Sequence, residues 1–312
     1  MPYGRPPKGS VGRRDDDPRH AYHRRIPWYR MSTDTGSVDV PAVGLGTWRL
    51  RGDDCRRAVA TALSLGYRHV DTAQAYGNER AVGTAIRESD VDREDVFLAT
   101  KLDGDGRRHE AVHRSVRESL DRLGTDYLDL LLIHWPNGRP PFLPVTMPGA
   151  TPLAETLGAM NELVEEGLVR HLGVSNFDRP LLDRARRLSD APIAANQVQF
   201  HPYWDQRRLL SYCRRHDVLL TAYSPLCHGG VLDDDCLARI GRRYDKTPAQ
   251  VAIRWVIQHD GVVAIPKATS RDHLAANLDV FDFELTDAEM EEIRRPSKLR
   301  TAAGFVRSRL PV

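Results

Sequence analysis

Short apolar runs alternate with longer segments from residue 42 to residue 265, and this alternation constrains the fold more than any other feature. Eight runs are rich in aliphatic residues: 42–45, 69–70, 96–100, 128–133, 169–174, 193–199, 218–222 and 262–265. Each intervening segment is long enough for the helical crossover that joins two parallel strands. Eight such units close a parallel barrel, so the sequence predicts a single-domain α/β chain folded as a parallel (β/α)8 TIM barrel.

The intervening segments have the spacing of amphipathic helices. One apolar face of the first segment consists of Cys55, Ala58, Val59, Ala62 and Leu63. The competing architecture is an open doubly wound sheet, which usually has a Gly-x-Gly-x-x-Gly turn after its first strand. Residues 44–48 read Gly-Leu-Gly-Thr-Trp and have no third glycine at the required offset. The barrel is therefore the favoured fold.

The N-terminal region differs in composition from the rest of the chain. Residues 1–30 contain eight basic and three acidic residues, five prolines and no apolar run typical of a signal peptide. A nucleic-acid-binding arm is one interpretation of this charge. We favour a disordered basic extension, for which translation from upstream of a true start at Met31 is one explanation, with the barrel and its C-terminal substrate loop in residues 31–312.

Cysteine usage and hydropathy narrow the class of protein. Cys55, Cys213, Cys227 and Cys236 form no Cys-x-x-Cys pair, which predicts reduced thiols, a cytoplasmic location and no metal site. No stretch approaches the ~18–20 uninterrupted apolar residues of a membrane span. We therefore expect partners that are small molecules and neither membranes nor nucleic acids.

Polar residues follow or end several of the predicted strands. They are Asp71, Lys101, His134, Ser175, Asn176, Gln197, Tyr223 and Lys267. In a barrel the carboxyl ends of the strands form one face, where active sites are built. Tyr76 lies five residues beyond Asp71 in a glycine-punctuated turn. An acid, a tyrosine, a lysine and a histidine on that face would form a proton-transfer set.

These four residues, Asp71, Tyr76, Lys101 and His134, resemble the catalytic tetrad of the aldo-keto reductases. Residues 66–83 and 160–177 match two long signatures of that family, and the resemblance covers roughly residues 38–290. The pattern is most similar to the prokaryotic 2,5-diketo-D-gluconate reductase-like branch. The resemblance implies reduction of aldehydes and ketones by hydride transfer from NAD(P)H to the carbonyl carbon.

The resemblance also assigns a role to each member of the tetrad. Tyr76 would be the proton donor, and His134 would orient the substrate carbonyl. An isolated tyrosine has a pKa of about 10, and a nearby ammonium is expected to lower it. Lys101 would supply that ammonium, with Asp71 as its counter-ion. Two alternatives are a cofactor-binding regulatory subunit of the same fold and a lyase that uses Lys101 as a Schiff-base amine.

The cofactor would occupy further positions that the resemblance identifies. Ser175, Asn176 and Gln197 would hold the nicotinamide carboxamide, and the ring would stack on Tyr223. The remaining expected cofactor contacts are Gly46, Thr47, Ser224 and Leu226.

The third family signature is altered in this chain. Residues 265–267 read Ile-Pro-Lys as expected, but Ala268 replaces a serine or threonine and His273 replaces an arginine. Asn277 occupies the adenine-contacting position. Lys267, Thr269, Ser270 and Arg271 could still bind a 2′-phosphate, which favours NADPH over NADH. In the alternative interpretation Ser270 only caps the next helix and Arg271 is solvated.

Two tryptophans are expected to line the substrate pocket. Trp48 follows the first strand and Trp135 follows His134. A proline-rich segment at 137–149 is expected to be a loop on the active-site face, and the last dozen residues resemble the variable C-terminal loop that shapes specificity in this family. The resemblance implies a small carbonyl substrate and a monomer, which is the usual form in this family.

Overall fold

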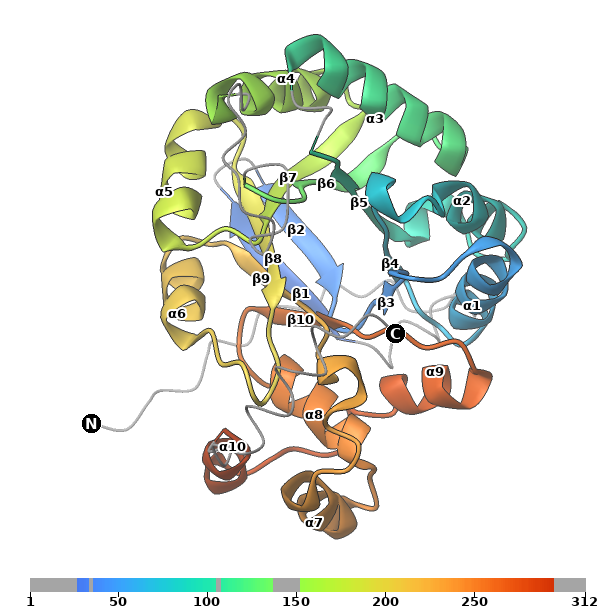
Figure 1. The fold of residues 1–312 in the computed structure, drawn as a ribbon, viewed down its shortest axis with the longest axis vertical. Coiled ribbons are helices and arrows are strands. Elements are labelled where there is room, and N and C mark those ends of the chain that lie inside the picture. The colour runs from blue at the N-terminus through green and yellow to red at the C-terminus, as the bar shows by residue number, and fades with distance from the viewer. Residues whose placement is uncertain (1–26, 34–35, 105–107, 137–151, 295–312) are drawn as a thin grey trace.

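The structure is a computed structural model that describes residues 27–33, 36–104, 108–136 and 152–294. Within these ranges eight parallel strands stand side by side in chain order (Figure 1). They are β3 (Leu45–Gly46), β4 (His69–Asp71), β5 (Phe97–Leu102), β6 (Leu128–Ile133), β7 (Val169–Ser175), β8 (Ile193–Gln199), β9 (Leu219–Tyr223) and β10 (Val262–Ile265). The chain before β3 returns to β10: the Gly44 amide donates to the Ala264 carbonyl at 2.8 Å. The predicted (β/α)8 barrel is confirmed.

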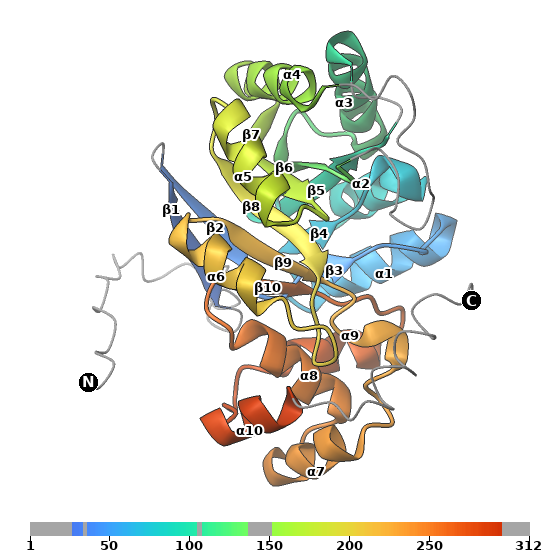
Figure 2. The ribbon, with the colours of Figure 1, turned by 60° about the vertical axis from the view of Figure 1, so that its left-hand side comes forward.

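Helices surround the barrel (Figures 1 and 2). The described ranges contain α1 (Gly52–Ser64), α2 (Glu79–Arg87), α3 (His109–Leu123), α4 (Leu153–Glu165), α5 (Arg179–Leu188), α6 (Arg207–Arg215), α7 (Asp235–Tyr244), α8 (Pro248–Ile257), α9 (Arg271–Leu278) and α10 (Asp287–Ile293). The apolar face expected for the first helix is buried in α1 at all five positions. In the part of the chain described here, none of the helices is long and apolar enough to cross a membrane.

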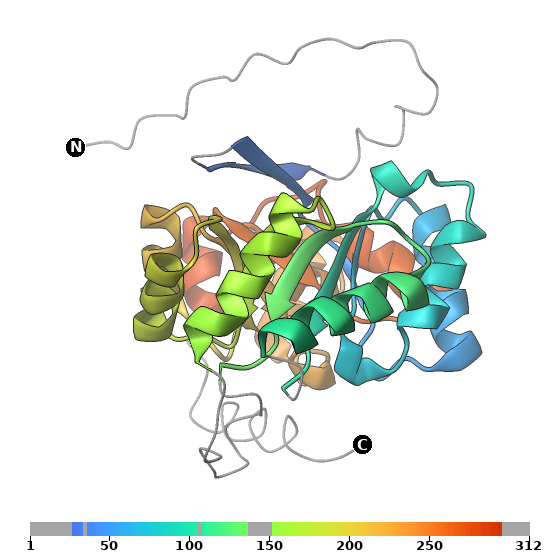
Figure 3. The same cartoon turned by 90° about the horizontal axis from the view of Figure 1, so that it is seen from above.

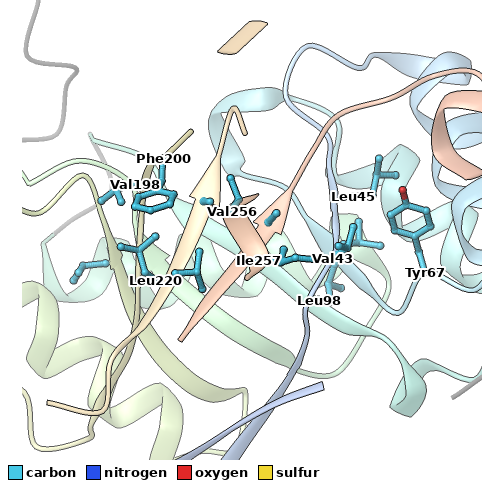
Figure 4. Packing of buried hydrophobic residues seen from close by; sticks show 14 of the residues in the cluster. Val43, Leu45, Tyr67, Leu98, Val198, Phe200, Leu220, Val256 and Ile257 are labelled. Atoms are coloured by element: carbon cyan, nitrogen blue, oxygen red, sulfur yellow. The ribbon is translucent and has the colours of Figure 1, made fainter. Parts of the chain in front are cut away.

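Apolar side chains form one layer between strands and helices and another inside the barrel. Along β5 the two layers alternate, because successive side chains of a strand point to opposite faces. Leu98 belongs to the outer layer, whereas Phe97 and Ala99 belong to the inner one. Figure 4 shows members of the outer layer, including Leu98 and Leu220. Since apolar side chains occupy both layers, the ends of the strands are where polar side chains can meet.

An antiparallel hairpin precedes the barrel and lies across one end of it (Figure 3). Its strands are β1 (Trp28–Thr33) and β2 (Gly36–Pro41). Val38 and Val40 pack against Phe97, the first residue of β5, so the hairpin covers the end where strands begin. The expected extension ended at residue 30, but residues 28–30 belong to β1, so that boundary requires correction. Residues 1–26 lie outside the described residues.

The hairpin should contribute measurably to stability through Tyr29. Its hydroxyl donates to the Ile257 carbonyl at 2.8 Å, and its half-buried ring packs against the inner layer. We expect Tyr29→Phe to lower the free energy of unfolding by about 1 kcal/mol, the usual contribution of one hydrogen bond. Tyr29→Ala should lower it by about 2 kcal/mol, since the ring contacts are lost as well. Urea denaturation measures both, and wild-type stability in both variants would mean that the hairpin is not docked as described.

Candidate active site

The four tetrad residues lie at the carboxyl ends of three neighbouring strands. Asp71 is the last residue of β4, Lys101 is near the end of β5, and His134 directly follows β6. Tyr76 ends a short 3-10 helix, η2 (Gln74–Tyr76), and is followed by Gly77 at a φ of 66°. A glycine adopts this left-handed conformation without steric cost, and the chain turns there into α2. The barrel thus brings the four residues to one mouth.

A buried ion pair lies at the base of this mouth. The Lys101 ammonium is 2.5 Å from Asp71 Oδ1, and both side chains are almost fully buried. Lys101 Nζ also donates to the Thr72 carbonyl at 2.7 Å. Asp71 Oδ2 accepts from Gln197 Nε2 at 2.7 Å. Burial lowers the pKa of Lys101, whereas the Asp71 carboxylate acts to raise it. These bonds offset the cost of removing two charges from water.

The Tyr76 ring lies above this pair, with Lys101 Nζ 5.0 Å from the ring centroid. Burial raises the pKa of Tyr76 well above its ordinary value, and the Asp71 charge raises it further. Any lowering of the pKa of the resting phenol by Lys101 is therefore outweighed by burial and the Asp71 charge. The physical reason is that desolvation disfavours the phenolate and that Asp71 offsets the charge of Lys101. The phenol stays protonated at neutral pH, as a proton donor must.

His134 faces Tyr76, with the two ring centroids 5.7 Å apart. Burial, assisted by the Lys101 charge, lowers the pKa of His134 to about 3. The imidazole is therefore neutral at pH 7 and carries one N–H. Its Nδ1 atom is buried without a hydrogen-bond partner, which is unusual in a folded protein. A neutral imidazole has one ring nitrogen that donates a hydrogen bond and one that accepts.

A polar network extends from His134 across the ends of β7, β8 and β9. Asn176 Nδ2 donates to the His134 carbonyl at 3.0 Å, and the Tyr223 hydroxyl donates to Asn176 Oδ1 at 2.8 Å. The Ser175 hydroxyl donates to the Gln197 carbonyl at 2.9 Å. Asn176 has a φ of 63°, a left-handed conformation that asparagine tolerates better than most residues. The structure therefore joins all the residues expected around the nicotinamide carboxamide.

Comparison with known proteins agrees with this geometry. Residues 42–297 match the family model described as the Aldo/keto reductase family. The chain belongs to the aldo/keto reductase family. It is accordingly an NAD(P)H-dependent carbonyl reductase, as the tetrad predicted.

The alignments with individual relatives span most of this reductase and most of each relative. Glyoxal reductase of Bacillus subtilis is 38% identical over 257 residues, which are 82% of this chain and 88% of the relative. Methylglyoxal reductase DkgB of Salmonella typhimurium is 41% identical over 254 residues, covering 81% and 91%. A solved structure provisionally named 2,5-diketo-D-gluconic acid reductase B is 45% identical, with a TM-score of 0.79 and coverage of 85% and 91%. The last similarity agrees with the branch that the sequence resembled.

The donor set of the reductase fits a nicotinamide carboxamide. Ser175, Asn176 and Gln197 offer hydroxyl and amide groups, which complement both the amino group and the oxygen of a carboxamide. In the structure these side chains form hydrogen bonds with one another and with neighbouring residues. A bound carboxamide would have to replace some of these hydrogen bonds. Thr47 is already committed, because its hydroxyl and its amide both donate to the Asp71 carbonyl, at 2.9 and 3.0 Å. Thr47 thus positions the backbone of Asp71.

Two further expected cofactor contacts lie after β9. Ser224 and Leu226 precede the 3-10 helix η4 (Cys227–Gly229), and Ser224 has a φ of 49°. Such a conformation costs a non-glycine residue on the order of 1–3 kcal/mol and is typical of functional loops. Gly46, at the end of β3, donates its amide to the Pro266 carbonyl at 3.2 Å. All three positions therefore lie near strand ends of the barrel mouth.

The expected phosphate-binding residues of the reductase gather at the start of α9. Lys267, Thr269, Ser270 and Arg271 are exposed there. Ser270 caps the helix, since its hydroxyl accepts from the His273 amide at 3.3 Å. Arg271 Nη1 donates to the Ser64 hydroxyl at 3.3 Å. Asn277 is buried instead, and the nearby Tyr67 hydroxyl donates to the Leu274 carbonyl of the same helix at 3.0 Å.

The two expected tryptophans follow β3 and β6, strands that are not neighbours in the barrel. The Trp135 ring is stacked beside His134, with 6.1 Å between centroids. Trp48 is 41% exposed and contacts two residues that the sequence analysis missed, Arg49 over its face at 4.3 Å and His228 at 5.5 Å. Arg49 could have been found from the sequence, because it directly follows Trp48. The proline-rich segment and the C-terminal tail fall outside the described residues.

Proposed function

We propose that this chain is an NADPH-dependent reductase of small, reactive carbonyl compounds, with 1,2-dicarbonyls as the preferred class. The observation that carries the catalytic part is the buried Lys101–Asp71 pair beneath a protonated Tyr76 and a neutral His134. The substrate class is supported by relatives named glyoxal reductase and methylglyoxal reductase. Tryptophans near the mouth suit compact substrates with little further specificity.

Each tetrad residue has a role that follows from its surroundings. A nicotinamide cofactor, when bound, would supply the hydride, since no side chain can. His134 donates its one N–H to the carbonyl oxygen and orients it. Tyr76 transfers its proton to that oxygen as negative charge develops there. The Lys101 ammonium stabilises the phenolate left behind, and Asp71 keeps that ammonium charged.

The geometry disfavours the alternative functions. A Schiff-base lyase needs a free amine, but Lys101 Nζ is held by Asp71 and by the Thr72 carbonyl. A regulatory subunit has no need for a neutral histidine beside a protonated tyrosine above a buried ion pair. Monomeric state and cytoplasmic location stay predictions.

The direct test is consumption of NADPH with methylglyoxal, glyoxal and an aromatic aldehyde, followed by loss of nicotinamide absorbance. We expect turnover with all three and the highest kcat/KM for a dicarbonyl. NADPH binding without turnover of any carbonyl compound would favour the regulatory alternative. Turnover confined to the aromatic aldehyde would refute the dicarbonyl preference and leave the tetrad roles intact.

Arg271 is proposed to bind the 2′-phosphate in place of the arginine missing at position 273. Arg271→Ala should raise the KM for NADPH about 10- to 100-fold, because a charge-assisted hydrogen bond contributes ~1.5–3 kcal/mol. The KM for NADH should stay nearly unchanged, since NADH carries no 2′-phosphate. Arg271→Lys is the matched control and should retain part of the preference. Equal increases for both cofactors would show that Arg271 supports the loop through Ser64 and does not read the phosphate.

A further inference from the structure

Two histidines one helical turn apart lie outside the active site. Residues 109–113 read His-Glu-Ala-Val-His at the start of α3, so His109 and His113 are at positions i and i+4. Residues with this spacing share one face of a helix, and two histidines so placed can bind one metal ion. This pattern contains no cysteine and is therefore independent of the cysteine spacing that predicted no metal site.

The neighbouring helix places a carboxylate between the two rings. Helices α3 and α4 lie side by side in the outer ring (Figures 1 and 2). Glu162 of α4 reaches both histidines: its Oε1 is 2.8 Å from His109 Nε2, and its Oε2 is 3.0 Å from His113 Nε2. One ligand atom from each of the three residues lies within 4.8 Å of the others. Two imidazole nitrogens and a carboxylate thus lie close enough together to approach one ion.

The outer ring nitrogen of His113 lies near a second carboxylate, that of Glu166. With Nε2 directed at Glu162, His113 Nδ1 lies 3.7 Å from Glu166 Oε1. Arg117 holds the other oxygen of Glu166 at 2.8 Å. Metal-ligating histidines almost always donate the second ring N–H to a carboxylate or carbonyl, which fixes the ring orientation. A shift of less than about 1 Å would turn the 3.7 Å separation into such a bond.

We propose that His109, His113 and Glu162 form a binding site for a divalent transition-metal ion, with Glu166 orienting His113. Imidazole and carboxylate ligands suit Zn²⁺, which binds them at about 2.0–2.2 Å. Two ligands of a tetrahedral ion at these distances are about 3.4 Å apart. The present nitrogen–oxygen separations need to widen by only about half an ångström. The side chains of His109 and Glu162 are nearly half exposed, so water can complete the coordination.

The site joins α3 to α4 on the outer ring, whereas the tetrad lies inside the barrel mouth. Its expected effect is therefore on metal affinity and on stability in the presence of metal, and kcat should not depend on it. The inference does not rest on the proposed substrate or cofactor, and its test needs no turnover.

The experiment uses the full chain, made free of metal with a chelator, and titrates ZnCl₂ against a chromophoric competitor. We expect one equivalent of Zn²⁺ to bind with a dissociation constant in the micromolar range or below. His113→Ala and Glu162→Gln should each weaken binding at least about 10-fold, and Glu166→Gln about 10-fold, as for other orienting partners. His216→Ala, which alters an imidazole at the end of α6, is the matched control and should bind as the wild type does.

Two further measurements separate this site from others on the chain. Co²⁺ should give the intense visible bands of tetrahedral coordination in the wild type, and these should be lost in His109→Ala/His113→Ala. Zn²⁺ should raise the Tm of the wild type but not that of the double variant, and circular dichroism checks that both are folded. Unchanged Zn²⁺ affinity in the folded double variant, or no binding to the wild type at tens of micromolar Zn²⁺, would overturn the proposal.

Discussion

Tyr76→Phe is expected to lower kcat for aldehyde reduction by a factor of about 1,000. Positioned general acids contribute between about 10² and 10⁴ in rate, and this substitution removes only the phenolic hydroxyl. The ring keeps its contacts with His134 and Lys101, so the loss should fall on the chemical step. The measurement is single-turnover oxidation of NADPH by purified variant and wild type with a dicarbonyl substrate.

The matched control is Tyr212→Phe, which removes a tyrosine hydroxyl on α6 that bonds Asp183 at 2.8 Å. That variant should retain the wild-type kcat, because Tyr212 lies on the outer ring. The Kd of Tyr76→Phe for NADPH, measured by fluorescence quenching, should stay within about twofold of the wild type. A Tyr76→Phe variant that keeps more than a few per cent of kcat would remove Tyr76 from the role of proton donor.

Lys101→Met should lower the free energy of unfolding by about 3–5 kcal/mol and abolish activity. The substitution leaves the buried Asp71 carboxyl without its cation, and breaking a buried ion pair by removing one partner is strongly destabilising. Gln197 still donates to Asp71 Oδ2, but a neutral amide replaces little of the lost attraction. Guanidinium denaturation at pH 7 measures the change in stability.

The double variant Lys101→Met/Asp71→Leu separates stability from catalysis. Removing both charges abolishes the buried unpaired carboxylate, so the double variant should be more stable than Lys101→Met alone. It should remain inactive, because the phenolate of Tyr76 would have no ammonium to stabilise it. If Lys101→Met were as stable as the wild type, the ion pair would not be buried as described. Recovery of activity in the double variant would contradict the role of Lys101.

Much of the fold could be predicted because the strands of the barrel are short apolar runs that can be recognised locally in the sequence. The bounds expected for the strands at 128–133, 193–199 and 262–265 agree with those of β6, β8 and β10. The first strand was less accurate, since β3 is only Leu45–Gly46 and the preceding residues bond to Ala264 across the closure of the barrel. The hairpin was missed because Val38 and Val40 acquire their partners only once the barrel interior exists.

The sequence by itself determined the (β/α)8 architecture and the family, and it predicted the four tetrad residues. These depend on local patterns: apolar periodicity, and polar side chains placed at the ends of strands. Only the tertiary structure decided how those side chains pair, because the pairs join residues far apart in the chain. It also decided their charge states, because these depend on burial and on neighbouring charges. Gln197 meets Asp71 across 126 positions, and Glu162 meets His113 across 49. Burial beside Asp71 raises the pKa of Tyr76, opposite to the expectation from a neighbouring lysine, because desolvation is a property of the folded protein.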